Sequence, residues 1–529
     1  MNTHRRLHIK NLELVFIGDF YFGNRSLDQT TDSGVEDFLS AIYYADYVIT
    51  HSFHCTAFST IFEKRFSSQA ITRAGSRVSD YLNTLGLQDH VIDDSADVSS
   101  ENIDYTTVRK KLIDMGWKSR IYLKSIITIE ADEMYLQTKG KSDCCGCTAC
   151  VTVCPKKCLV MEEDEYGFLF PRIEKLEQCI HCHRCEVVCP IEKNKSISPK
   201  EKYPAPICLS GWHQDESVRA TSTSGAAFVG IVQACEKNGF SRFYGVRYDD
   251  ELMAIHTGVD SAEEIACLVS TKYVQSNVGN SFFDVMSELQ TEKKVVFSGT
   301  PCQVEGLQNV VPNNLRDNLI TIALVCHGVS SPEAYKKYIK EVGEKNTSSV
   351  SSIKFRDKRQ KNGELSHRFT TITLQNGKVL TDTENLYTLT FGLGLMHREC
   401  CSSCPYATPY RSADFSIGDF WGIEDYKPEL KSEIPKGISL IYAHSERAKN
   451  LLAELRKTML LNEEPLEHSL HIRQQQLRMP FARNPRRDQF LKKVITDGLD
   501  FEAIAEREFQ RWRYINFAKR VARKVLRRR

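Results

Sequence analysis

The chain has 529 residues, 41% of them hydrophobic and 26% charged, and its 70 basic and 68 acidic side chains give a net charge of +2. This composition is typical of globular proteins and argues against a disordered chain and against a membrane protein. The near balance of charge provides no global field for nucleic acid, so we expect no nucleic-acid partner. At about 150 residues per domain, the length predicts roughly three or four folding units.

The cysteines and the N-terminal sequence indicate a reducing compartment. The chain has 19 cysteines, several of them in Cys-x-x-Cys steps. An apolar run near the start is bracketed by Glu13 and Asp19 and is followed by no small-residue cleavage site, so we expect no export signal. No stretch reaches the ~20 apolar residues that span a bilayer. We therefore expect a cytoplasmic protein whose thiols are available for metal.

Strand-like and helical patterns alternate along most of the chain, which is typical of an α/β multidomain protein. The first such stretch, residues 1–135, contains the runs LELVFI, YVITHSF and VEDFLSAIYYA. Cysteines dominate residues 140–195, where only short elements fit between them. The pattern returns over residues 206–500 as a mixed sheet, with a hairpin turn predicted at Asn376-Gly377. Residues 501–529 have the pattern of a basic helix.

Two cysteine runs follow the spacing C-x2-C-x2-C-x3-C-P, and the second repeats the first 35 residues later (179 − 144 = 35). This spacing is typical of ferredoxins with two [4Fe–4S] clusters, in which the fourth cysteine of each run binds the other cluster. By that resemblance one cluster is held by Cys144, Cys147, Cys150 and Cys189, and the other by Cys179, Cys182, Cys185 and Cys154. A pair of zinc sites is the alternative. We interpret Cys145 as a bystander and Cys158 as a packing residue.

Four further cysteines are candidates for a third [4Fe–4S] cluster. Two follow predicted strands, at the carboxyl edge where α/β folds bind ligands, and two form a Cys-x-x-Cys step: Cys302, Cys326, Cys401 and Cys404. The alternative is that they are ordinary buried core residues, and the neighbouring Cys400 leaves the choice of ligand open.

A segment rich in hydroxyl groups and glycine precedes a predicted helix and exposes amide donors suited to a pyrophosphate: Ser222, Thr223, Ser224 and Gly225. An ordinary helix cap is the alternative. Gly299 and Thr300 end a predicted strand in the same way, at the edge where a cofactor would bind.

Motifs after residue 206 resemble the coenzyme F420 hydrogenase/dehydrogenase beta subunit family over about 140–500: ATSTSGAAF, TKYVQS, VVFSGTPCQVEGL, LVCHGVSSP, FRDK, RECCSSCPY and DFSIGDFWG. The resemblance implies a ferredoxin module that feeds a flavoprotein-like domain binding FAD or another flavin, and its Arg398-x-x-Cys401 spacing favours Cys401 over Cys400. It also implies Lys272 beside a phosphate and His327 as a proton donor, although either is equally a surface or capping residue. The family often has Gly-Gly where this chain has Gly225-Ala226, and an Asp near Ala323. No residue indicates that F420 itself is used.

Residues 33–66 resemble the polysaccharide pyruvyl transferase family, whose motif corresponds here to Ser52, Phe53 and His54. The resemblance extends to about 130 and covers the second of that family's two Rossmann-like halves. It implies that transferase activity requires a partner half.

These patterns together predict an iron–sulfur flavoprotein oxidoreductase in cell-surface polysaccharide synthesis, acting on a glycan precursor or supplying electrons to a redox partner protein or reductase. The alternatives are a pyruvyl transferase with an accessory iron–sulfur module and a non-catalytic electron-transfer adaptor. Residues 511–529 have apolar residues on one helix face surrounded by Arg and Lys, which predicts peripheral contact with the inner face of the membrane. A solvated basic helix is the alternative.

Overall fold

The computed structural model describes residues 35–69, 76–92, 102–126, 136, 139–194, 199–361 and 364–526. The strand expected near the start of the chain lies outside these residues. The chain divides into two compact units, Met1–Asp132 and Glu133–Arg529, and each is described by itself.

The N-terminal unit is a small α/β structure, as its alternating pattern predicts. Its three strands are parallel and lie in the order β1 (Tyr47–Thr50), β2 (Arg65–Gln69), β3 (Val91–Ile92). The helices are α1 (Val35–Tyr44), α2 (Phe53–Ile61), α3 (Ser76–Leu85) and α4 (Tyr105–Ile126). Ile42, Phe66 and Leu82 form the centre of its core.

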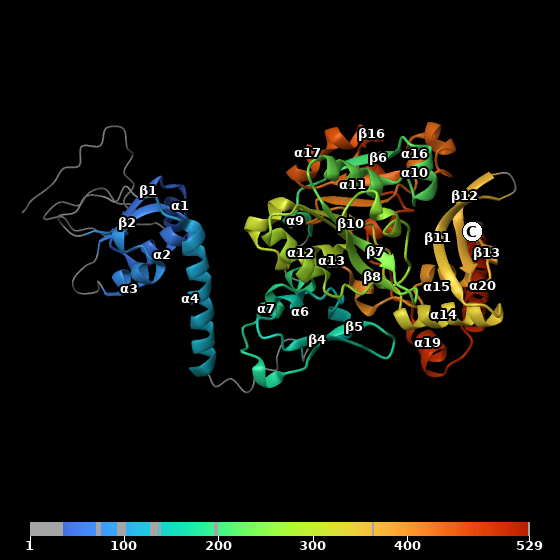
Figure 1. Ribbon diagram of the computed structural model, residues 1–529, viewed down its shortest axis with the longest axis horizontal. Coiled ribbons are helices and arrows are strands. Elements are labelled where there is room, and N and C mark those ends of the chain that lie inside the picture. Colours follow the sequence, from blue (N-terminus) through green and yellow to red (C-terminus); the bar gives the residue numbers. More distant parts are fainter. Residues whose placement is uncertain are drawn as a thin grey trace, which may run out of the picture. The chain divides into compact units, whose positions relative to one another are not determined.

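The cysteine runs belong to a module built on one antiparallel hairpin, β4 (Leu159–Glu163) with β5 (Leu169–Ile173). Short helices accompany the runs: α6 (Ala149–Val153), α7 (Arg184–Val187) and α8 (Pro190–Lys193). In Figure 1 this module borders the helices α12 (Ser281–Gln290) and α13 (Pro301–Val310). The contact with α13 is close, because a Cβ atom on Gly306 would lie 3.0 Å from Cys147 Sγ.

An eight-stranded mixed sheet forms the centre of the C-terminal unit (Figure 1). Its order is β16 (Met459–Glu464), β6 (Ile207–His213), β15 (Ser439–Ala443), β14 (Phe415–Asp419), β10 (Leu319–Leu324), β9 (Val295–Gly299), β7 (Arg242–Tyr248) and β8 (Ala254–Val259). The four strands β14, β10, β9 and β7 are parallel neighbours, so their carboxyl ends meet at one edge.

Helices cover both faces of this sheet, and successive residues of each strand point to opposite faces. Val296 and Ile320 pack with α11 (Ala227–Lys237) and α17 (Glu446–Leu455) on one face. Val295 and Phe297 pack with α12 and α13 on the other face. This two-sided burial explains why the strands are continuous apolar runs in the sequence.

A second, antiparallel sheet packs beside the first and consists of β11 (Val350–Lys361), β12 (Glu364–Leu374) and β13 (Val379–Asp382). The hairpin turn predicted at Asn376-Gly377 joins β12 to β13. The helices α14 (Pro332–Lys345), α15 (Leu386–Gly392) and α20 (Phe501–Leu526) share the core of this sheet. Phe501 is fully buried there, so the basic helix expected as a separate tail from residue 501 begins inside the core.

Candidate functional site

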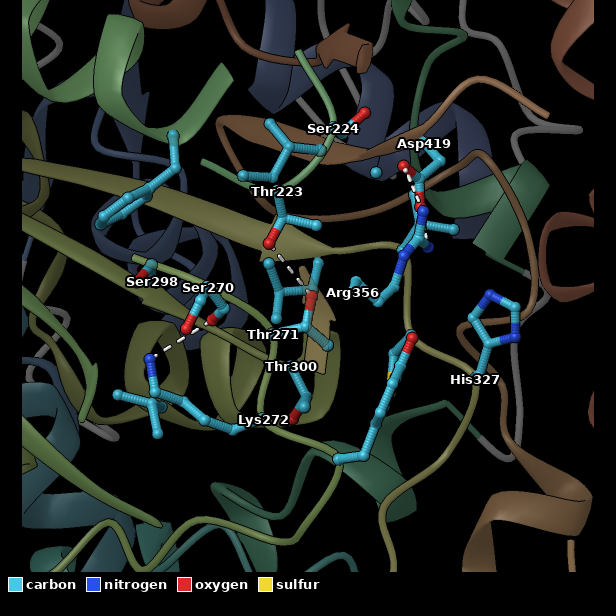
Figure 2. Close-up of a pocket in the computed structure, with 18 of the residues that line it drawn as sticks. Thr223, Ser224, Ser270, Thr271, Lys272, Ser298, Thr300, His327, Arg356 and Asp419 are labelled. Carbon is cyan, nitrogen blue, oxygen red and sulfur yellow. Dashed lines mark hydrogen bonds and ion pairs between the residues drawn. The ribbon is translucent and has the colours of Figure 1, made fainter. Parts of the chain in front are cut away.

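A pocket of about 260 Å³ opens at the carboxyl edge of the parallel strands (Figure 2). Three strands line it with their last residue: Gly299 of β9, Leu324 of β10 and Asp419 of β14. We call this cavity the sheet-edge pocket. Its position agrees with the general location of ligand sites in α/β sheets.

One part of the sheet-edge pocket is lined by the hydroxyl-rich segment before α11. Ser222, Thr223 and Ser224 line it, and the backbone of Ser224 and Ala226 is left-handed, with φ of 53° and 65°. Gly225 does not line the pocket. Its backbone N–H donates to Ser439 Oγ at 2.9 Å, and a Cβ atom on it would lie 2.5 Å from Gly211 O. Gly225 therefore anchors the segment to the sheet.

Two half-buried lysines lie beside this segment. Lys272 Nζ donates to the carbonyl oxygens of Leu268, Val269 and Ser270 at 3.1–3.3 Å. Lys358 Nζ donates to the carbonyl oxygens of Arg219 and Ser224 at 2.5 and 2.6 Å.

No carboxylate among the described residues lies within ion-pair distance of Lys272 or Lys358. Burial lowers the pKa of each lysine to about 8, so both are mainly charged at neutral pH. The family resemblance implies Lys272 beside a phosphate, and this stays a prediction. In the structure its ammonium donates to carbonyl groups and contributes positive potential to the pocket wall.

The other part of the pocket carries an ion pair that sequence reasoning missed. Arg356 Nη1 lies 2.5 Å from Asp419 Oδ2, and its guanidinium lies over the Trp421 ring at 5.6 Å. Burial acts to raise the pKa of Asp419, but the charge of Arg356 holds it below its usual value. Arg356 has a left-handed φ of 57° where β11 shifts register. The motifs FRDK and DFSIGDFWG contain these two residues and were the sequence signal that could have identified them.

A second cavity, of about 170 Å³, shares a wall with the sheet-edge pocket. The residues that line both are Thr300, Cys326, His327, Gly328, Val329 and Gln476. Thr300 caps α13, and its Oγ1 lies 3.2 Å from Cys302 Sγ. Burial lowers the pKa of His327, so its imidazole is neutral at physiological pH.

Six cysteines line this second cavity, which we call the six-cysteine cavity: Cys145, Cys302, Cys326, Cys400, Cys401 and Cys404. All four residues predicted for a third cluster are therefore brought together. Cys145, interpreted from the sequence as a bystander, joins them because its thiol contacts those of Cys147 and Cys302. Burial raises the pKa of the Cys326 and Cys404 thiols to about 12.

The cysteine runs surround a third, smaller cavity lined by Cys144, Cys145, Cys147, Cys150, Cys185 and Cys189. It contains all four residues assigned to one ferredoxin cluster, including Cys189 from the second run. Cys145 lines this cavity as well as the six-cysteine cavity. The two cavities are therefore adjacent.

Three cysteines of the two runs do not line this cavity: Cys154, Cys179 and Cys182. Burial raises the pKa of Cys185 to about 11, and the nearby thiols of Cys182 and Cys179 act in the same direction. Cys154 Sγ lies 3.4 Å from Cys158 Sγ. Among the residues that the structure describes, no His, Cys, Asp or Glu side chains form a group of three able to hold a single metal ion. The ligands of a [4Fe–4S] cluster surround a cavity instead, because each thiolate binds a different iron.

In comparisons with known protein families, two regions of the chain match, one in the cysteine-run module and one in the large domain. Residues 143–193 match the 4Fe-4S dicluster domain. Residues 292–469 match the C terminus of the coenzyme F420 hydrogenase/dehydrogenase beta subunit. The chain thus carries an iron–sulfur electron-transfer domain and a region similar to that redox subunit. No curated protein matches it.

One solved structure with a detectable likeness is a chain of the F420-reducing [NiFe] hydrogenase complex from Methanosarcina barkeri. It is 16% identical, with a TM-score of 0.35, and the match covers 50% of this chain and 83% of that chain.

The N-terminal unit lies outside both matched family ranges, and the resemblance to pyruvyl transferases stays a prediction. Ser52 follows β1 and caps α2, where its Oγ accepts a hydrogen bond from Cys55 N at 3.5 Å. His54 lies in the first turn of α2 and is exposed. Both residues are therefore at the carboxyl edge of the parallel strands.

Proposed function

We propose that this protein is an iron–sulfur flavoprotein oxidoreductase, with FAD or another flavin in the sheet-edge pocket and three [4Fe–4S] clusters. The observation that carries the proposal is the order of the cavities. Cys326 and His327 lie between the sheet-edge pocket and the six-cysteine cavity, and Cys145 lies between that cavity and the first cysteine run. Electrons would pass along this series one at a time.

The residues of the sheet-edge pocket fit a flavin dinucleotide. Its hydroxyl-rich part combines Ser222, Thr223 and Ser224 with Lys272, which has no carboxylate partner among the described residues, and this combination favours a diphosphate. Apolar side chains, including Phe228 and Leu268, line the remaining wall and suit aromatic rings. A bound flavin exchanges hydride with substrates and single electrons with iron–sulfur clusters.

Two groups of this chain would act beside the flavin ring in the sheet-edge pocket. His327 holds a neutral imidazole in the shared wall, where it donates or accepts a proton next to a bound ring. The Arg356–Asp419 pair fixes a planar guanidinium in the same pocket, which orients a polar substrate group.

The six-cysteine cavity fits the donor set of a third cluster, since a [4Fe–4S] cluster takes four thiolates. We assign Cys302, Cys326, Cys401 and Cys404 as its ligands. Cys145 and Cys400 are then additional thiols at its border.

The electron-exchange surface for a redox partner protein is proposed on the module at Cys179, Cys182 and Cys185. Leu176, Ile180 and Val187 are exposed apolar residues on the same segment. An apolar patch around a cofactor allows close approach of a partner protein. Substitution of Ile180 and Val187 by Lys is expected to slow reduction by a soluble electron donor without changing iron content.

The proposed substrate class is a glycan precursor, because the N-terminal unit resembles half of a polysaccharide pyruvyl transferase. Release of phosphate from phosphoenolpyruvate in the presence of a sugar acceptor would instead support the transferase alternative.

We also propose peripheral membrane contact through 511–529. Within the described residues no helix is long and apolar enough to cross a membrane. Trp512, Tyr514 and Ile515 of α20 are exposed, and loss of binding to anionic liposomes after deletion of 511–529 tests this contact.

Anaerobic purification followed by iron, sulfide and flavin counts tests the main proposal. About twelve irons and one flavin per chain are expected, and about eight irons would leave two clusters. Cys404→Ala should remove about four irons, whereas Cys235→Ala, in the core of α11, should remove none. Absence of flavin after gentle isolation would overturn the oxidoreductase and leave the electron-transfer adaptor.

A further inference from the structure

Arg398 is a buried cation between the cysteine-run module and the six-cysteine cavity. Its side chain is 1% exposed and lines that cavity. Nε donates to Cys144 O at 2.7 Å, Nη1 to Gln275 Oε1 at 2.9 Å, and Nη2 to Leu169 O at 2.9 Å. The guanidinium thus holds the first cysteine run against the large domain.

All of these partners are neutral. The guanidinium also lies 4.1 Å from the Phe170 ring centre and 5.4 Å from that of Phe168. No carboxylate among the described residues lies within 4 Å of it. Neutral oxygen atoms satisfy the N–H groups but do not cancel the charge, and a buried, uncompensated charge is costly.

Arg411 repeats this arrangement beside the same cavity. It is 3% exposed, and its N–H groups donate to the carbonyl oxygens of Thr408, Leu324 and Tyr406, each at 3.0 Å. It too has no carboxylate within 4 Å among the described residues. Tyr406 lines the cavity, and the charge of Arg411 acts on the thiols of Cys326 and Cys404.

Other buried or cavity-lining arginines in this unit are paired in the ordinary way. Arg219 is 1% exposed, and its Nη1 lies 2.6 Å from Glu433 Oε2. Arg473 also lines the six-cysteine cavity but binds Glu424 and Asp425 at 2.6 and 2.9 Å. Among the described residues, the other buried arginine, Arg487, also lies near a carboxylate, that of Asp488 at 2.7 Å, so Arg398 and Arg411 are the buried arginines with no carboxylate within 4 Å.

We propose that Arg398 and Arg411 are the counter-charges of the iron–sulfur clusters and set their reduction potentials. Arg398 acts on both the cluster of Cys144 and the cluster of the six-cysteine cavity, and Arg411 acts on the latter alone. The part of the proposal that concerns the cluster of the six-cysteine cavity rests on the proposed function. Lys139, which donates to Cys189 Sγ at 2.8 Å, adds positive charge to the first cluster only.

The physical basis is electrostatic. Four thiolates and the iron–sulfur core carry net negative charge, and each added electron increases it. A fixed cation in a water-poor site stabilises the more negative state more strongly, which raises the reduction potential. Both guanidinium groups stay protonated as one electron enters and leaves, because arginine does not titrate in proteins. These are positioning residues, which act through charge and not by bonding to the reacting atoms.

The test is a potentiometric titration of the anaerobic holoprotein, followed by electron paramagnetic resonance, in parallel with an iron count. Arg398→Gln should make the reduction equilibrium of two clusters at least tenfold less favourable, a shift of about −59 mV for a one-electron step. Arg411→Gln should shift one cluster only. Arg398→Lys keeps the charge and should stay near the wild-type potentials.

Gln275→Glu is a second variant that retains Arg398 but gives it a carboxylate partner, and it should shift the same two clusters in the same direction. Unchanged potentials in Arg398→Gln and Gln275→Glu at full iron content would overturn the proposal and leave a purely structural clamp. If the wild-type protein has only about eight irons, the third-cluster assignment fails separately, while the shift of the first cluster still decides the role of Arg398.

Discussion

Substitution of Gly225 by Ala tests the packing that shapes the sheet-edge pocket. The added Cβ would lie 2.5 Å from Gly211 O and 2.9 Å from Ser439 N. Both atoms are main chain, and Gly211 and Ser439 are paired neighbours on β6 and β15. Neither can rotate away, so the hydroxyl-rich segment has to move.

The expected cost follows from two contributions. Overpacking against fixed backbone costs about 1–3 kcal/mol. Displacement of the segment also removes the hydrogen bond from Gly225 N to Ser439 Oγ, worth about 1 kcal/mol. We therefore expect Gly225→Ala to lower the free energy of unfolding by about 2–4 kcal/mol and to reduce the flavin content of the purified protein.

The assay is urea unfolding followed by tryptophan fluorescence, together with flavin absorbance of protein purified without oxygen. Gly392→Ala is the matched control, because Gly392 ends α15 and a Cβ there meets nothing within 4 Å. Gly392→Ala should leave the free energy of unfolding unchanged or raise it slightly. Equal stability and equal flavin content in the two variants would refute the reasoning.

Four further predictions concern this pocket and the residues beside it. Flavin retention should fall as pH rises through about 8, where Lys272 in the pocket wall loses its charge, and fluorescence of released flavin measures it. The free energy of unfolding should instead rise as pH increases from about 8 toward the usual lysine pKa. The pKa of both lysines is lower in the folded protein, so the unfolded chain binds more protons in this range. Ala226→Gly should raise the melting temperature, since it relieves about 1 kcal/mol of left-handed strain at φ 65°. Asp419→Asn should cost about 3–5 kcal/mol in urea unfolding, because Arg356 is left without its partner.

The cysteine runs were the most predictable part of the molecule, because their ligand set depends on spacing within short segments. The strand-end positions of Cys302 and Cys326 also followed from the sequence, since buried parallel strands are continuous apolar runs. The position of Cys145 in the walls of two cavities did not follow from the spacing, and its interpretation as a bystander to the clusters stays a prediction.

Lys272 and Arg356 show the same limit. The phosphate contact of Lys272 stays a prediction, and the sequence pattern did not indicate that the carbonyl groups of residues 268–270 accept hydrogen bonds from its ammonium. Arg356 reaches Asp419 from a register shift between β11 and the adjacent strand β12, whereas Asp419 lies 63 residues later in the chain, so this contact depends on tertiary packing. Sequence patterns located the pocket, whereas the direction of each charged side chain required the tertiary structure.

The crowding of six thiols in one cavity has a practical consequence for anyone preparing the protein. A cluster uses four of them, and the cavity brings all six close together, with Cys145 in contact with Cys302. Neighbouring thiols that meet an oxidant are converted to disulfides. Protein expressed in air should therefore be treated with a reductant before iron and sulfide are supplied, because an oxidised pair would block the entry of the metal.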